Sequence, residues 1–167
     1  LGSMDLDRAA MGADRAGDLL YVANEDAGLK VVDLTDPRLP VEVGLLPLPE
    51  TLPPSSAQDV LVVGEWAYVA HEFGGLAAAR IVDPVVPTYV GSWTAGERAL
   101  TLAHDAGTLF VGCNGGEVHV FDVADGTPVP LTSFAVDGVV HALDVQEHLL
   151  AIAAGDASGL TLLDVTD

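Results

Sequence analysis

The sequence predicts an all-β protein assembled from one structural unit that recurs along the chain. Apolar and polar residues alternate over short runs, as in Leu-Lys-Val-Val-Asp at 29–33, which is typical of strands. The 167 residues include 18 glycines and 10 prolines but only 5% aromatic residues, a composition that suits many short strands joined by tight turns. The same pattern returns at nearly constant spacing, which indicates a repeat architecture.

Four segments align with one another. They are LLYVANEDAGLKVVDLTDP from residue 19, WAYVAHEFGGLAAARIVDP from 66, TLFVGCNGGEVHVFDVADG from 108 and LAIAAGDASGLTLLDVTD from 150. Two sets of positions follow the same steps of 47, 42 and 42 residues: Tyr21, Tyr68, Phe110 and Ile152, and Gly28, Gly75, Glu117 and Gly159. One period therefore corresponds to one supersecondary unit.

Each unit is expected to contain four strands. The first is represented by DVLVVG at 59–64 and the second by AYVA at 67–70. A glycine-containing loop leads to the third strand, LKVVDL at 29–34, and the fourth is VEVGLLPL at 41–48. Consecutive short strands of this kind form an antiparallel meander.

The turn between the third and fourth strands carries an Asp-x-x-Asp pattern. Asp33 and Asp36 are expected to accept backbone N–H groups there, while Pro37 sets its own φ. The pattern recurs at Asp122 and Asp125 and at Asp164 and Asp167. We therefore interpret these aspartates as turn residues rather than as an acid/base pair.

Four-stranded meanders repeated in this way are the blades of a β-propeller. The sequence thus predicts an all-β β-propeller with four recognisable blades, at about 10–49, 57–95, 99–136 and 140–167. Residues 1–9, which begin LGSM, are interpreted as a tag remnant and leader. The stretch PLPETLPPSS at 47–56 is expected to be a long loop between the first two blades.

The fourth blade is predicted to lack its outer strand. Its repeat stops at Asp-Val-Thr-Asp, where the first repeat continues into PRLPVEVGLLPLP. Two alternatives stay open at this stage. The blades form part of a larger propeller or an arc that a second copy completes, or they close a four-bladed ring with one short blade.

Charge and cysteine content exclude several classes. The net charge is −19, with 25 acidic residues against six basic ones, so nucleic-acid partners are not expected. No apolar run approaches the roughly 18–20 residues of a membrane span, so no membrane insertion is expected. Cys113 is the only cysteine, which rules out an intrachain disulfide and a cysteine metal cluster.

The repeat pattern YVA…GL.VVD.TDP..P..VG resembles the LVIVD repeat family of bacterial and archaeal β-propellers. The resemblance covers nearly the whole chain and departs from the pattern at LAAAR (76–80) and at Gly126, which replaces a proline. It implies a propeller fold, commonly in secreted or surface proteins. A secreted, periplasmic or cell-surface location is therefore expected from the resemblance alone, which implies no single activity.

Candidate binding residues lie in the loops that a propeller gathers on one face. Their oxygen, imidazole and guanidinium groups are suited to a hard cation such as Ca²⁺, or to a sugar or peptide. The residues are Glu25, Asp26, His71, Glu72, Arg98, Asn114, His141 and Asp156. No pair of histidines has the spacing of a local metal site, so the metal ligands remain unassigned.

The sequence contains no recognised catalytic set, and GDASG at 155–159 is interpreted as a turn. We expect a non-catalytic module for protein binding or assembly, which contacts a protein partner or a second copy through its loop face or a blade edge. One alternative is a cation- or carbohydrate-binding propeller, with Ca²⁺ as its cofactor. Another is a hydrolase or lyase that uses His104 and His141 in the axial channel.

Overall fold

The computed structural model describes residues 2–50, 55–95, 97–155 and 159–166. Blade 1 contains β1 (Gly12–Ala16), β2 (Leu19–Ala23), β3 (Leu29–Asp33) and β4 (Val41–Leu46). Blade 2 contains β5 (Asp59–Val63), β6 (Trp66–His71), β7 (Gly75–Arg80) and β8 (Thr88–Trp93). Blade 3 contains β9 (Ala99–Asp105), β10 (Thr108–Cys113), β11 (Glu117–Asp122) and β12 (Val129–Ala135). Blade 4 contains β13 (Val140–Gln146), β14 (Leu149–Ala154) and β15 (Gly159–Asp164).

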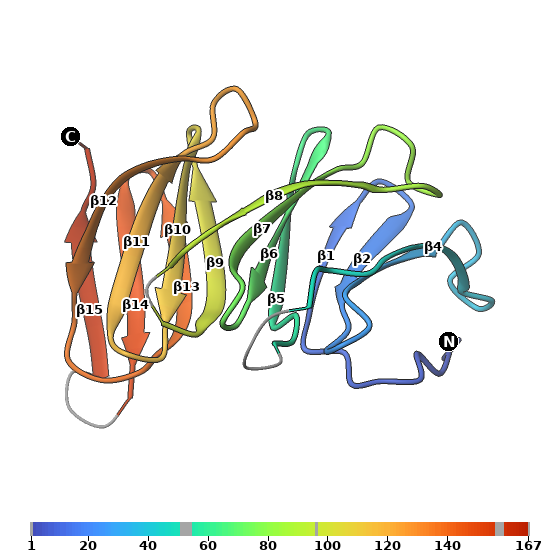
Figure 1. Ribbon diagram of the computed structural model, residues 1–167, viewed down its shortest axis with the longest axis horizontal. Coiled ribbons are helices and arrows are strands. Elements are labelled where there is room, and N and C mark those ends of the chain that lie inside the picture. Colours follow the sequence, from blue (N-terminus) through green and yellow to red (C-terminus); the bar gives the residue numbers. More distant parts are fainter. Residues whose placement is uncertain (1, 51–54, 96, 156–158, 167) are drawn as a thin grey trace.

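Each blade is an antiparallel meander in which strands adjacent in sequence are hydrogen-bonded neighbours. Three sheets have four strands and the sheet of blade 4 has three, which confirms both the repeat and the short last blade. The sheets lie one after another along the molecule, and the two termini lie at its opposite ends (Figure 1). The described part of the chain contains no helix with the length and apolar character needed to cross a membrane.

The predicted Asp turns are confirmed between the third and fourth strands of blade 1. Asp33 Oδ1 accepts the Thr35 N–H at 2.7 Å and Asp36 Oδ1 accepts the Arg38 N–H at 3.0 Å. In blade 3 the Ala124 N–H donates to Asp122 Oδ1 at 2.9 Å. The hydrogen bonds from Thr35 lower the pKa of Asp33, because they stabilise the ionised carboxylate.

The core consists of apolar layers between successive blades. Because side chains alternate along a strand, each middle strand contributes to two layers. Tyr21 packs in the layer between blades 1 and 2, Tyr68 in the layer between blades 2 and 3, and Phe110 in the layer between blades 3 and 4. Tyr68 and Val69 therefore belong to different layers, although they are neighbours in sequence.

One correspondence in the sequence alignment is wrong. Leu19 pairs with Asp33 and Leu149 pairs with Asp164, so Leu149 occupies the position of Leu19. Ala151 consequently occupies the position of Tyr21, and Ile152 does not. The reason is one additional residue in the hairpin of the fourth repeat, which a gap-free alignment does not allow: Ala153 pairs with Leu160, seven positions on, whereas Ala23 pairs with Leu29, six positions on.

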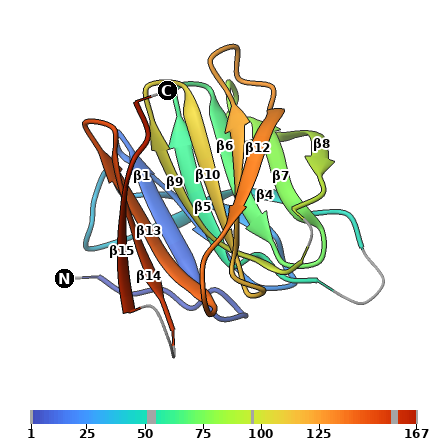
Figure 2. The same ribbon diagram turned by 90° about the vertical axis from the view of Figure 1, so that its left-hand side faces the viewer.

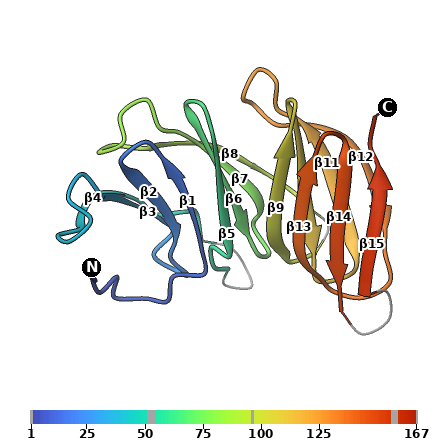
Figure 3. The same cartoon turned by 180° about the vertical axis from the view of Figure 1, so that it is seen from behind.

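The four sheets form an open arc. The innermost strands pack in succession, β1 against β5, β5 against β9 and β9 against β13. Within the described ranges no comparable packing joins β13 to β1. Figure 3 shows the innermost strands in this order, and Figure 2 views the arc from the side of blade 4. Blades 1 and 4 therefore each have one face that no other blade covers.

Residues 2–10 cover the outer face of blade 1. The Lys30 ammonium donates to the Leu6 carbonyl at 2.9 Å and to Glu42 Oε2 at 2.9 Å. Asn24 Nδ2 donates to the carbonyls of Arg8 and Ala9 at 2.9 and 3.1 Å. Lys30 is buried as a result, so this end of the arc is shielded from solvent.

Candidate functional site

Three of the predicted site residues meet where blades 2 and 3 join. The Arg98 guanidinium donates to Glu72 Oε1 and lies over the Phe73 ring, 5.4 Å from its centroid. Glu72 is buried, and its other oxygen accepts the Ser56 N–H at 3.2 Å. Asn114 Oδ1 accepts the Arg98 N–H at 3.3 Å. The Glu72 carboxylate and the Asn114 amide oxygen are thus engaged within the protein, whereas the buried Arg98 Nε has no hydrogen-bond partner among the described residues.

The same contact recurs in three blades. In blade 1 the side chain of Glu25 accepts the backbone N–H of Ala9 at 3.4 Å. In blade 2 the side chain of Glu72 accepts the backbone N–H of Ser56, and in blade 3 the side chain of Asn114 accepts the backbone N–H of Arg98. Each acceptor follows the second strand of its blade, and each donor lies just before the first strand of the same blade. These loop residues therefore hold the two ends of a blade together, and their role in ligand binding stays a prediction.

The other predicted residues are dispersed. Asp26 is exposed and pairs with Arg8 at 2.7 Å. His71 is buried, which lowers its pKa, although the nearby Glu72 carboxylate acts in the opposite direction. His141 is exposed at the start of β13, and Asp156 lies outside the described residues. Among the described side chains no group of three His, Cys, Asp or Glu is arranged to hold a metal ion.

The two histidines assigned to the axial channel do not come together. His104 lies near the end of β9, where its Nε2 accepts the Gly107 N–H at 3.3 Å. His141 lies at the other end of its strand, beside Gly155. Burial lowers the pKa of His104, with the Asp105 charge acting against this shift. The arrangement brings no acid/base pair to the axis through these residues.

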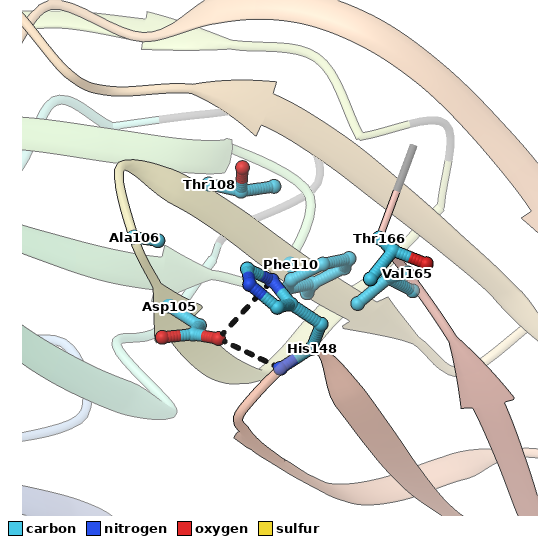
Figure 4. Close-up of a pocket in the computed structure, with 7 residues that line it drawn as sticks. All are labelled: Asp105, Ala106, Thr108, Phe110, His148, Val165 and Thr166. Carbon is cyan, nitrogen blue, oxygen red and sulfur yellow. Dashed lines mark hydrogen bonds and ion pairs between the residues drawn. The ribbon is translucent and has the colours of Figure 1, made fainter.

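A cavity of about 190 Å³ lies between blades 3 and 4 (Figure 4). Its lining includes Asp105, Thr108, Phe110, His148 and Thr166. Asp105 Oδ2 accepts the His148 N–H at 3.1 Å and lies 3.8 Å from His148 Nδ1. The sequence analysis missed this pair, which is separated by 43 residues, about one blade period. The contact joins the turns of two blades and is therefore structural in kind.

Aspartates on the innermost strands form a second set that the sequence analysis missed. Asp14 Oδ2 accepts the Val62 N–H at 2.7 Å, which joins blades 1 and 2. Asp59 Oδ2 accepts the Leu102 N–H at 2.9 Å, which joins blades 2 and 3. With Asp105, every junction between described blades has a carboxylate that accepts a backbone N–H of the next blade. In the sequence these are the aspartates of the innermost strands, Asp14 within β1, Asp59 at the start of β5 and Asp105 at the end of β9.

The side of blade 4 that faces away from blade 3 is an open apolar surface, which we call the bare face. Leu160 and Leu162 occupy the positions of Val118 and Val120 in blade 3. The leucines are 66% and 56% exposed, whereas the valines are 0% and 8% exposed. The bare face consists of Ala142, Asp144, Gln146, Leu149, Ala151, Ala153, Leu160, Leu162 and Asp164.

The polar edge of the bare face is acidic. Asp144 pairs with Ala151 as Asp14 pairs with Tyr21, so Asp144 occupies the position of an inter-blade carboxylate. It lines a groove of about 450 Å³ together with Gln146, Glu147, Leu149 and Ala151. No described blade supplies an N–H group to Asp144. The bare face thus carries the features that elsewhere in the chain receive a neighbouring blade.

Comparisons with known proteins agree with this architecture. The LVIVD repeat model matches residues 9–46 and 54–95. A search of curated proteins found no match. The computationally designed Ika4 protein is similar in structure, with a TM-score of 0.71 and 14% identity over 96% of this chain and 94% of that one.

Two longer proteins are also similar in structure. U3-55K has a TM-score of 0.79 and 11% identity, over 97% of this chain and 50% of that one. BamB from Moraxella catarrhalis has a TM-score of 0.69 and 22% identity, over 98% of this chain and 49% of that one. The chain thus spans about half the length of these two proteins. The chain thus carries LVIVD repeats over residues 9–46 and 54–95 and has the blade architecture of a β-propeller.

Proposed function

We propose that the chain is a non-catalytic assembly module that binds a second copy of itself through the bare face of blade 4. The observation that supports this proposal most directly is the exposure of Leu160 and Leu162 at positions that are buried in blade 3. Burying a leucine side chain contributes about 1.5–3 kcal/mol. Contiguous apolar surface of this kind is typical of an interaction site.

The two ends of the arc differ in a way that favours head-to-tail association. All six basic residues lie within the first 98 residues, and four of them are in or next to blade 1: Arg8, Arg15, Lys30 and Arg38. Blade 4 has no basic residue, and its bare face carries Asp144 and Asp164. Opposite charges on two surfaces steer their association and fix its register. Blade 1 also carries acidic residues, so the complementarity is confined to single pairs, and the exposed Arg15 of one copy is placed to meet Asp144 of another.

The loop face is a weaker candidate for the contact surface. Glu72, Arg98 and Asn114 are engaged in internal hydrogen bonds and an ion pair. A ligand that recruited them would have to compete with contacts that hold the blades together. The bare face offers apolar side chains without such a competing role.

The proposal can be tested by measuring molar mass with light scattering over a range of protein concentrations. The wild-type chain is expected to form a dimer of about twice 17.2 kDa. Leu162→Glu should give a monomer, because it places a charge in the centre of the apolar contact. Leu131→Glu is the matched control, since Leu131 is 58% exposed on the outer strand of blade 3 and should leave the dimer intact. A wild-type chain that stays monomeric, or equal dissociation of both variants, would contradict the proposal.

A further inference from the structure

The outer edge of β15 has no partner strand among the described residues. In blades 1 and 2 the third strand pairs with an outer strand that has a glycine at the same position of the pairing. Gly44 lies opposite Val31 in blade 1, and Gly91 lies opposite Ala78 in blade 2. Leu162 of β15 occupies the equivalent position in blade 4. An edge with free N–H and C=O groups is a template for pairing with another chain.

The start of β15 retains a space that an outer strand fills elsewhere. A Cβ atom at Gly28 would lie 2.4 Å from the Leu46 carbonyl oxygen, and one at Gly75 would lie 2.3 Å from that of Trp93. Both oxygens belong to outer strands. Gly159 occupies the same position in blade 4, and a Cβ atom there would meet nothing within 4 Å. Blade 4 therefore has the glycine of a complete blade beside an open edge.

Residues at the start of the chain share a Gly-Ser pair with an outer strand. Gly2 and Ser3 correspond to Gly91 and Ser92 of β8, and the same gap-free register places Ala10 at the position of Ala99, the first residue of β9, although residues 5–9 have no identity with 94–98. The contacts support this register, because Ala9 donates to Glu25 as Arg98 donates to Asn114. Residues 2–4 thus correspond to the end of an outer strand.

We propose that residues 2–4 of a second copy pair with the free edge of β15, so that two chains exchange these segments and close one eight-bladed ring. This inference rests on the proposed function and adds the segment that makes the contact. By the register of blade 2, Gly2 would lie opposite Leu162 and Met4 opposite Leu160. The segment must come from another copy in the arc described, because the N-terminus and β15 lie at opposite ends of the molecule (Figure 1).

The lengths of two similar structures agree with this exchange. The chain covers 50% of U3-55K and 49% of BamB, as expected if two arcs make up one propeller. Blade 1 of the second copy would then face the bare face and bring Arg15 toward Asp144. Residues 2–7 would leave the outer face of blade 1, where Lys30 keeps Glu42 as its partner. The Gly2 N–H would leave the Pro37 carbonyl, and Lys30 would leave the Leu6 carbonyl; strand pairing in blade 4 would offset the loss of these two contacts.

Disulfide trapping between two different variants tests the exchange. A Met4→Cys chain is mixed with a Leu160→Cys chain that carries a mass label, and covalent heterodimer is measured after mild oxidation. Residues opposite each other in an antiparallel pair are close enough for a disulfide bond. The control mixture combines Met4→Cys with Leu131→Cys, whose side chain has similar exposure on blade 3. We expect roughly tenfold more heterodimer from the 4–160 mixture, because a formed complex raises the effective thiol concentration.

The outcomes separate this inference from the proposed function. A dimer in solution without preferential 4–160 linkage would overturn strand exchange and leave assembly through the bare face standing. A monomer without linkage would overturn both. A chain that carries both substitutions and becomes linked within itself, at the mass of a monomer, would overturn the exchange in favour of a ring closed at four blades.

Discussion

Asp59 joins blades 2 and 3 by accepting the backbone N–H of Leu102 at 2.9 Å, while its other oxygen accepts the N–H of Val60 at 2.9 Å. Asp14 makes the equivalent pair of contacts with Val62 and Arg15 at 2.7 Å each. One carboxylate thus connects two neighbouring innermost strands. It accepts backbone N–H groups on the axial edge of each strand, where no further strand of the same sheet pairs with them. Burial raises the pKa of Asp59, because the loss of hydration disfavours the ionised form more than these donors favour it.

Replacing Asp59 with alanine should destabilise the protein by about 1–3 kcal/mol, because the N–H of Leu102 would lose its acceptor in a partly buried place. Urea unfolding followed by far-UV circular dichroism measures this change. Asp83→Ala is the matched control, since Asp83 accepts the Val85 N–H at 3.0 Å in an exposed turn. Equal free energies of unfolding for the two variants would show that the inter-blade carboxylate has no special role.

The repeat, the four-stranded unit and the short last blade could be predicted because they depend on local alternation and turn chemistry. Asp33 and Thr35, for example, make their contact within three residues of chain. The register of β14 could not be predicted from the same pattern. Ala151 and Ile152 are both apolar, and a single added loop residue decides which one faces the bare face.

The candidate site was predicted less completely. The loop positions of Glu72 and Arg98 follow from the repeat, but their ion pair depends on how blades 2 and 3 stack. The aspartates at the junctions were missed because the sequence analysis considered aspartates only in turns and loops. The interpretation of residues 1–9 as a tag remnant and leader stays a prediction, and the proposed strand exchange depends on the Gly-Ser pair that residues 2–3 share with 91–92.

His71 should make stability depend on pH as the pH falls below about 6.5. Burial lowers its pKa in the folded chain, so the unfolded chain binds a proton first as the pH falls. The free energy of unfolding should therefore decrease across this window, and His71→Gln should make the decrease smaller. Unfolding curves in urea at several pH values measure the slope. The exposed His141 provides the control, because His141→Gln should retain the wild-type slope.

Cys113 should be inert while blades 2 and 3 remain packed. Its thiol donates to the Ala95 carbonyl at 3.2 Å, and burial raises its pKa to about 12. Such a pKa leaves roughly a thousandfold less thiolate at pH 8 than an ordinary cysteine has. Labelling with a thiol reagent should be slow in native buffer and fast in guanidinium chloride. Rapid labelling of the native chain would indicate that this junction opens. Slow labelling would also mean that Cys113 does not form disulfide bonds that compete with those of the trapping experiment.

Gly126 should tolerate alanine much less well than Gly17 does. Both have positive φ, 87° and 62°, so each Gly→Ala variant loses about 1–2 kcal/mol from backbone conformation alone. A Cβ atom at Gly126 would also lie 1.9 Å from Trp66 Nε1, whereas one at Gly17 would meet nothing within 4 Å. Overpacking of this kind costs a further amount of about 1–3 kcal/mol. Proline, which the first repeat has at position 37, does not fit at Gly126, because proline fixes φ at about −65° and lacks the N–H that Gly126 donates to the Val123 carbonyl. Urea unfolding monitored by tryptophan fluorescence measures both variants, and an equal loss in the two would contradict the packing of Trp66 against this turn.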